Sequence, residues 1–412
     1  MSINCSFRII IIYFCLYLSG LSVSAQVQVR NTIWNGEDFL CTPACRVVKE
    51  DSIRSLIFES VSYKGQAKSV FAYYATPAML QGNSSQEKKL PGIILVHGGG
   101  GTAFREWVVM WAKRGYAALA LDTRGNGPDK KHIDGGFDEN EKETPYFDVT
   151  LPQKEQWVYQ AVSDIFNAHS LLLSFPEVDV ERTAITGISW GGVLTCIAAS
   201  LDSRFRVAVP VYGCGFLSES GRMKQQLDGL PDEQREIWLK QYDPSNYLPR
   251  MERPILFING TNDVHFYLPS MARSAVLASQ SGLLIKQGLR HSHKYGWQSE
   301  EIAAFIDQYL RDVKPLAQIT NEKVEEGLVS GEIISSTPVE KATLHYTTDS
   351  GQEREKYHWQ AIESKVEKNK WRIPLPAGIT TWYVNITDVR GYQISGRSMR
   401  WPISTARRIT TI

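Results

Sequence analysis

One serine stands in a setting that can activate it as a nucleophile. The run Gly187-Ile188-Ser189-Trp190-Gly191-Gly192 follows a short apolar segment, residues 183–186, and precedes small residues typical of a buried helix. A strand, a tight turn and a helix in this order hold a serine in a strained conformation with its hydroxyl exposed. Gly187 and Gly191 suit this turn because a Cβ at either position would meet the neighbouring strand or helix. The N–H of Trp190, where the helix begins, is predicted to donate to an oxyanion.

A serine hydroxyl is a poor nucleophile at neutral pH. It needs a neutral imidazole to accept its proton, and the imidazole needs a carboxylate on its other nitrogen. Asp263 follows the apolar segment 254–260, and His291 follows the apolar segment 283–286. Each lies just past the expected C-terminal end of a strand, where parallel sheets place their sites. We therefore predict Ser189 as the nucleophile, Asp263 as the acid and His291 as the base.

Other residues compete for these roles. His293 is the alternative base, because it lies only two positions after His291. Asp263 has a structural alternative, in which it caps the helix that follows. Asp122 is a less favoured candidate for the triad acid because it precedes Ser189 in the chain, and we expect it to support a turn. His265 is expected to line the pocket or to pack locally.

The remaining histidines carry no catalytic prediction. His97 is expected to orient a glycine loop by hydrogen bonding. The other four have no partner that the sequence indicates, and we expect them in loops or at the surface: His132, His169, His345 and His358.

A second glycine-rich element follows a strand. Residues 91–96 are apolar on both faces, as expected for a central parallel strand, and they lead into His97-Gly98-Gly99-Gly100-Gly101. Glycines let backbone N–H groups approach a substrate oxygen closely, so Gly98 or Gly99 is predicted as the second oxyanion donor. The alternative is a phosphate-binding loop, but the lysine and the Ser or Thr that such a loop requires are absent.

Strand-like and helix-like segments alternate from about residue 90 to residue 312. This order predicts a mainly parallel central sheet flanked by helices. Residues 125–150, rich in Gly, Asp, Lys and Pro, form a long irregular excursion that is placed to shape the pocket mouth. Past residue 314 the sequence changes to runs of alternating polar and apolar residues, with turn residues between them. It predicts a small all-β domain, an immunoglobulin-like or fibronectin-like sandwich.

The composition and the first residues limit the classes of partner and the compartment that we expect. The 45 basic and 44 acidic side chains give a net charge of +1, so no basic patch indicates a nucleic-acid partner. Residues 1–25 read as a signal peptide, with an apolar core and a small-residue cleavage pattern at Val23-Ser24-Ala25. We expect export to the periplasm or beyond the cell, with no membrane attachment after cleavage. In such a compartment Cys41 and Cys45 are candidates for a disulfide.

Several of these motifs together carry a family resemblance. They are His97-Gly-Gly-Gly-Gly-Thr-Ala-Phe, Gly115-Tyr-Ala-Ala-Leu-Ala-Leu-Asp, Gly187-Ile-Ser-Trp-Gly-Gly, Gly260-Thr-Asn-Asp and His291-Ser-His. The chain resembles exported α/β-hydrolases of the acetyl xylan esterase and dienelactone-hydrolase-like group over residues 90–312. The resemblance implies an α/β-hydrolase catalytic domain, which we place at residues 26–314, and the alternating runs after it predict the β domain at residues 315–412. The resemblance also implies hydrolysis of carboxylic esters, with an acetylated polysaccharide or a small ester as substrate. The Ser-His-Asp mechanism needs neither a metal nor an organic cofactor.

Two further functions stay open. The Gly-x-Ser-x-Gly-Gly form is similar to prolyl-oligopeptidase-type peptidases, although these normally carry a large N-terminal propeller for which this chain has too few preceding residues. Alternatively, the hydrolase shell is inactive and the protein binds carbohydrate through its β domain. An exposed row among Trp359, Trp371, Trp382 and Trp401 would support binding, whereas buried tryptophans would serve the core. The sequence does not indicate the oligomeric state.

Overall fold

The computed structural model describes residues 32–35, 39–82, 89–138, 145–351, 353–397 and 399. The segment Trp34–Ile412 forms one compact unit, and the account below concerns that unit. The predicted signal peptide, residues 1–25, lies outside the described residues, and so does Trp401. The domain boundary at residue 314 stays a prediction.

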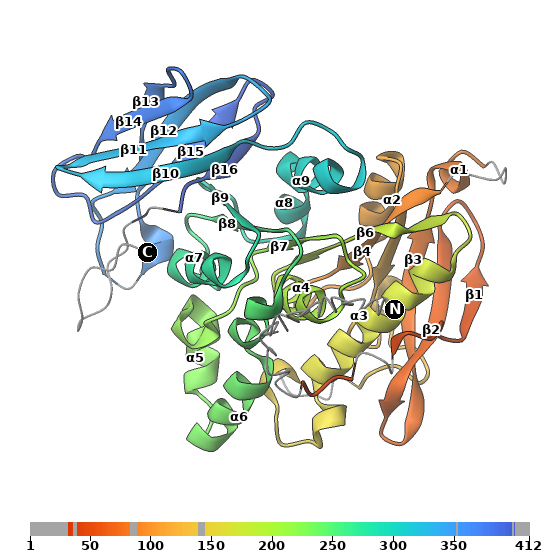
Figure 1. Cartoon of the computed structure of the whole chain (residues 1–412). Helices are drawn as coiled ribbons and strands as arrows, with labels where there is room; N and C mark the ends of the chain where they lie inside the picture. Colours follow the sequence, from red (N-terminus) through yellow and green to blue (C-terminus); the bar gives the residue numbers. More distant parts are fainter. Residues whose placement is uncertain are drawn as a thin grey trace, which may run out of the picture. The chain divides into compact units, whose positions relative to one another are not determined.

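A nine-stranded sheet is the centre of the fold (Figure 1). Its order is β1-β2-β3-β5-β4-β6-β7-β8-β9, and every pairing from β5 to β9 along this order is parallel. The first strands pair antiparallel. The prediction of a mainly parallel sheet is therefore confirmed. The strands are β1 (Cys45–Lys49), β2 (Arg54–Tyr63), β3 (Gln66–Ala75), β4 (Leu90–Val96), β5 (Ala117–Leu121), β6 (Val178–Ile188), β7 (Val207–Val211), β8 (Ile255–Gly260) and β9 (Ser281–Lys286).

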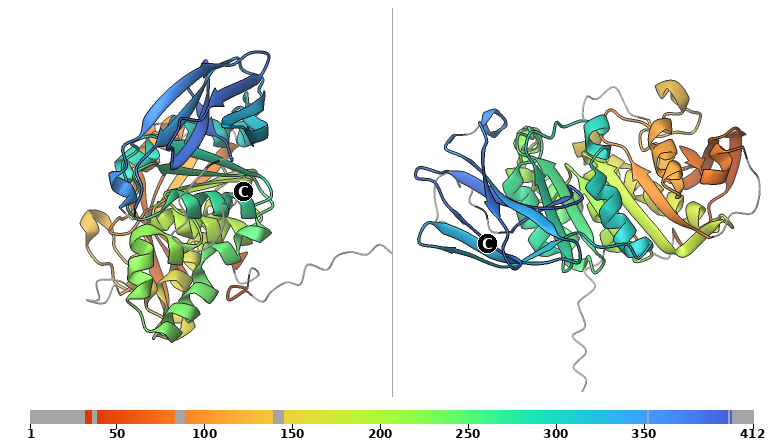
Figure 2. Two further views of the ribbon diagram at one scale, coloured as in Figure 1. Left: turned by 90° about the vertical axis from the view of Figure 1, so that its left-hand side faces the viewer. Right: turned by 90° about the horizontal axis from the view of Figure 1, so that it is seen from above.

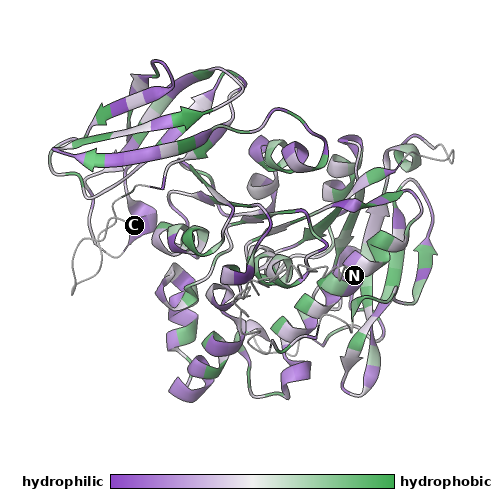
Figure 3. Cartoon of the chain, in the orientation of Figure 1, coloured by the Kyte–Doolittle hydropathy of each residue, from purple (hydrophilic) through white to green (hydrophobic). Residues whose placement is uncertain are grey.

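Helices flank the sheet because its central strands are apolar on both faces. All residues of β5, β7 and β8 are buried, and so are those of β4 after Leu90. The helix α3 is buried almost along its whole length, whereas α5 and α6 are mostly hydrophilic (Figure 3). The helices are α1 (Pro77–Leu80), α2 (Arg105–Lys113), α3 (Trp157–Ser174), α4 (Trp190–Leu201), α5 (Gly221–Asp228), α6 (Asp232–Tyr242), α7 (Leu268–Leu277), α8 (His293–Trp297) and α9 (Glu300–Leu310). Within the described part of the chain, no helix has the length and apolar character needed to cross a membrane.

The C-terminal region forms two antiparallel sheets, as the alternating runs predict. One sheet has the order β10-β11-β14 and the other has the order β13-β12-β15-β16. Their strands are β10 (Gln318–Glu325), β11 (Leu328–Ile334), β12 (Val339–Thr347), β13 (Gln360–Lys365), β14 (Lys370–Pro374), β15 (Thr381–Asp388) and β16 (Gln393–Ser395). Trp371 and Trp382 are each 3% exposed and serve the core, so they form no exposed row. Trp359 is half-buried.

This region packs against β9, the last strand of the large sheet, at the end opposite β1 (Figures 1 and 2). The side-chain amide of Asn385 donates to the carbonyl of Ile285 at 2.9 Å, and the N–H of Ile285 donates to the Ser395 hydroxyl at 2.7 Å. Both backbone groups of Ile285 that face away from β8 are thus satisfied by side chains rather than by a tenth strand.

Candidate active site

The serine turn has the expected conformation. Ser189 connects β6 to α4 with φ 58° and ψ −118°, a region that non-glycine residues rarely adopt. Its N–H donates to the carbonyl of Val211 at 2.8 Å, which anchors the turn on β7. A Cβ on Gly187 would lie 2.1 Å from the carbonyl oxygen of Gly191, and one on Gly191 would lie 2.1 Å from that of Val96. Only glycine fits at either position, so the steric argument made from the sequence is confirmed.

The structure joins the three predicted catalytic side chains in one hydrogen-bonded chain. His291 Nε2 lies 2.9 Å from the Ser189 hydroxyl oxygen, and His291 Nδ1 lies 2.6 Å from Asp263 Oδ2. A carboxylate accepts hydrogen bonds, so Nδ1 carries the proton and Nε2 is free to accept from the serine. The backbone N–H groups of His265 and Phe266 donate to the other Asp263 oxygen, at 2.7 and 2.9 Å. They aim the carboxylate at His291, so the arrangement suits general-base activation of Ser189.

The imidazole of His291 contacts two other rings. The Tyr212 ring centre lies 4.6 Å from that of His291, and the Tyr212 hydroxyl donates to the carbonyl of Arg290 at 2.7 Å. The His265 ring lies 4.6 Å away, and burial lowers the pKa of His265 to about 4. His265 is therefore neutral at physiological pH and adds no charge beside the candidate base, consistent with the local packing expected of it.

The contacts of the glycine loop distinguish its two candidate oxyanion donors, Gly98 and Gly99. The N–H of Gly98 donates to His293 Nε2 at 2.8 Å, so this group is engaged. A Cβ on Gly99 would lie 2.9 Å from the Trp190 ring, which places Gly99 against the serine turn. The N–H of Trp190 is at the first position of α4 and has no acceptor within the helix. Of the two predicted loop donors, Gly99 is thus the better placed.

Residues 52–256 match the family model described as acetyl xylan esterase, a span that includes the glycine loop and Ser189 but ends before Asp263 and His291. The acid and the base therefore rest on the hydrogen bonds of the structure.

The solved structures agree on the fold. The acetyl xylan esterase from Paenibacillus sp. R4 is similar with a TM-score of 0.53 and 21% identity, over 67% of this chain and 92% of the other. Acetyl xylan esterase 1 from Thermoanaerobacterium sp. JW/SL YS485 gives a TM-score of 0.54 and 18% identity, over 66% and 92%. The acylamino-acid-releasing enzyme of Sus scrofa is 26% identical over 45% of this chain. The chain covers only about a quarter of the length of the curated relatives it matches.

His293 supports the glycine loop. It lies at the first position of α8, its ring centre is 4.7 Å from that of Phe104, and its Nε2 accepts from Gly98. Burial lowers the pKa of His293 to about 4, so the imidazole is a neutral acceptor at physiological pH. The histidine bonded to Ser189 is His291, so the structure does not support His293 as the alternative base.

His97 holds the same loop through the carbonyl of Gly98. Its Nε2 accepts the N–H of Thr123 at 3.0 Å, so Nδ1 carries the proton and donates to the carbonyl of Gly98 at 2.8 Å. The predicted orienting role of His97 is therefore confirmed. Asp122 accepts from the N–H groups of Arg124 and Asn126, both at 2.8 Å, and supports a turn as predicted.

Tyr146 reaches the loop from the irregular excursion. Its hydroxyl accepts from the N–H of Gly100 at 3.3 Å, and its ring stacks on Trp190 with centres 4.9 Å apart. Trp157 contacts the same Tyr146 ring edge-on at 4.5 Å. This contact was missed from the sequence. The only signal was that the excursion is long and lies between two core elements.

Three expectations outside the site are wrong. His169 is fully buried on α3, with Asp202 at 2.8 Å from Nδ1 and Thr183 at 3.0 Å from Nε2. His345 is buried as well, and its ring stacks on Tyr383. Both were expected in loops or at the surface, but they lie on α3 and β12, where tertiary partners satisfy them. The exposed residues Cys41 and Cys45 are free thiols and form no disulfide in the structure.

Proposed function

We propose that the protein is an exported serine esterase that removes acetyl or similarly small acyl groups from a polysaccharide. The observation that carries the proposal is the hydrogen-bonded chain from Ser189 through His291 to Asp263, beside a glycine loop. The family match of residues 52–256 supports ester hydrolysis. The complete triad also weighs against an inactive hydrolase shell. The signal-like residues 1–25 support export.

The mechanism follows from the side chains present. Ser189 attacks the ester carbonyl while His291 Nε2 takes its proton, and Asp263 stabilises the resulting imidazolium. The N–H groups of Trp190 and Gly99 bind the oxyanion. The imidazolium then gives its proton to the departing alcohol, which leaves an acyl-serine. Water then attacks the acyl-serine while His291 takes its proton, and the imidazolium returns that proton to the serine oxygen as the carboxylic acid leaves.

The C-terminal region has a role in this proposal. We take its two antiparallel sheets to be an immunoglobulin-like or fibronectin-like sandwich, which the strand count and pairing support. It covers β9, the strand that leads to His291, and its side chains fix the backbone of Ile285. We infer that it stabilises the base-bearing end of the sheet.

A peptidase is the second candidate. The observation that favours it is the 26% identity to the acylamino-acid-releasing enzyme, whose name denotes release of acylated amino acids. Peptidases and esterases share the triad chemistry, so the substrate distinguishes them.

The test compares wild type with Ser189→Ala on p-nitrophenyl acetate, on longer-chain p-nitrophenyl esters and on an aminoacyl-p-nitroanilide. Short-ester turnover lost in Ser189→Ala, but kept in the control Ser200→Ala on α4, supports the esterase. Anilide cleavage lost in the same variant puts the peptidase first. Export is tested by N-terminal sequencing of the mature protein from a bacterial host, which we expect to begin near Gln26.

A further inference from the structure

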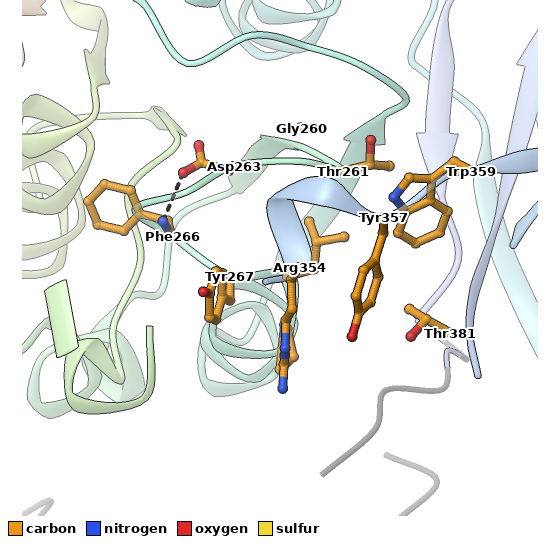
Figure 4. Close-up of a pocket in the computed structure, with 11 residues that line it drawn as sticks. Gly260, Thr261, Asp263, Phe266, Tyr267, Arg354, Tyr357, Trp359 and Thr381 are labelled. Carbon is orange, nitrogen blue, oxygen red and sulfur yellow. Dashed lines mark hydrogen bonds between the residues drawn. The ribbon is translucent and has the colours of Figure 1, made fainter. Parts of the chain in front are cut away.

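The loop that carries the candidate acid is bound by the C-terminal region. Asn262 comes directly before Asp263, and its side-chain amide donates to the carbonyl of Glu355 at 2.8 Å and to that of Tyr357 at 3.0 Å. Figure 4 shows the acid loop and this C-terminal segment facing each other across a small pocket. The neighbour of the acid in the chain is thus attached to residues 93 and 95 positions away.

The hydroxyl of Thr261 extends this contact to the loop that carries the base. It donates to the amide oxygen of Asn262 at 2.6 Å and accepts from the N–H of Gly288 at 3.0 Å. The N–H of Thr261 donates to the carbonyl of Lys286 at 3.2 Å. Thr261 is only 5% exposed, so these bonds are largely shielded from water. The Asn262 side chain is therefore bonded at both of its polar atoms, and it connects the acid loop, the base loop and the C-terminal region.

The same C-terminal segment also binds the base loop directly. Gln287 lies between β9 and His291, and its amide donates to the carbonyl of Trp359 at 3.2 Å. The amide oxygen of Gln287 lies 2.9 Å from Nδ1 of His345 on β12, which donates to it. Both loops of the candidate triad are thus attached to one segment of the C-terminal region, residues 355–359.

The contact between acid and base depends on how these two loops lie relative to each other. Asp263 Oδ2 lies 2.6 Å from His291 Nδ1. Two backbone N–H groups within the acid loop orient the carboxylate, but they move with that loop and do not fix it to the base. We propose that Asn262 is a positioning residue, through which the C-terminal region holds Asp263 against His291. The proposal rests on the proposed function, because it assumes a working triad.

The test is a double-mutant cycle in the full chain, measured as turnover of p-nitrophenyl acetate. Asn262→Ala should lower kcat about 10- to 100-fold and leave KM within about threefold, because a misplacement of about 1 Å costs about 10²-fold in rate. In the Asp263→Ala background the same substitution should change kcat by less than about twofold, since no carboxylate is left to position. Turnover in Ser189→Ala is the blank.

Asn246→Ala is the matched control. The Asn246 amide also donates to two carbonyls, those of Leu239 at 2.8 Å and Lys240 at 3.3 Å, in the segment between α6 and β8. This variant loses bonds of the same kind, and it should leave kcat unchanged. Asn262→Leu, which fills the space of the amide without donating, carries the same comparison if Asn262→Ala does not fold.

Two results would overturn the proposal. One is loss of kcat by the same factor in both backgrounds, which would show a general effect on the fold, and the other is wild-type kcat in Asn262→Ala. Labelling of Ser189 by a fluorophosphonate, which needs the triad but no ester substrate, is measured in the same variants. If wild type is labelled but hydrolyses no ester, the esterase proposal fails, and the labelling rates still decide the role of Asn262.

Discussion

The hydrogen bond from Gly98 to His293 Nε2 allows a sharp test of how the candidate oxyanion loop is held. We predict that His293→Phe lowers kcat and leaves KM within about threefold of wild type. Phenylalanine keeps a ring against Phe104 but has no acceptor for the Gly98 N–H. The loop then loses one of its two imidazole contacts and the neighbouring N–H of Gly99 is less well fixed. Only the transition state depends on that N–H, so the effect falls on kcat.

The magnitude follows from the donor at risk. Loss of one oxyanion donor costs about 10²–10³ in kcat. His97 still holds the carbonyl of Gly98, so the loop is loosened and not released. We therefore expect a fall of about 10²-fold. The Gly98 N–H without an acceptor also costs about 1–3 kcal/mol of stability.

The assay is turnover of p-nitrophenyl acetate at pH 7, with urea unfolding for stability. His293→Gln is the matched variant, because its amide oxygen can accept from Gly98, and it should recover most of the kcat lost in His293→Phe. His291→Ala is the reference for loss of the base. Wild-type kcat in His293→Phe would refute the reasoning, and so would equal impairment of the Gln and Phe variants.

Three other predictions follow from groups around the site. Lys68→Met should lower the free energy of unfolding by about 3–5 kcal/mol, because Asp164 is then buried without its partner. Urea titration measures this loss, and the control is the double variant Lys68→Met/Asp164→Leu, in which the free energy of unfolding should recover. Burial lowers the pKa of His97 to about 4, below its ordinary 6.5. The unfolded chain therefore takes up the proton first, and the free energy of unfolding should fall by up to about 3 kcal/mol from pH 6.5 to pH 4. An identical profile of unfolding free energy against pH in His97→Asn would contradict this. Gly191→Ala should give no soluble enzyme or a loss above about 4 kcal/mol, because its Cβ meets the carbonyl of Val96; normal expression and Tm would contradict it.

Local signals in the sequence were enough for the parallel sheet and for the three triad candidates. Apolar runs followed by polar loops mark the strand ends, and the structure brings Ser189, Asp263 and His291 together there. The edge strand β1, Cys45–Lys49, was not predicted, because all five of its side chains are exposed and no apolar pattern marks it.

Contacts between distant residues were beyond reach of the sequence. Gly98 and His293 are 195 positions apart, so the choice of Gly99 over Gly98 could not be made from the loop alone. His169 looked unpartnered because Asp202 and Thr183 are supplied by other elements after folding. Side-chain partners of this kind depend on the packing of the whole fold and leave no periodic signal.

The contacts at Ile285 have a consequence for how the protein can be handled. β9 is a sheet edge, and an uncovered edge offers its N–H and C=O groups to any extended chain it meets. Asn385 and Ser395 occupy those groups with side chains, which cannot propagate a sheet. A chain cut after residue 314 would present that edge to its own copies. The C-terminal strands thus cover the edge of β9 and prevent its pairing with another copy. The hydrolase part is expected to aggregate when it is produced without them.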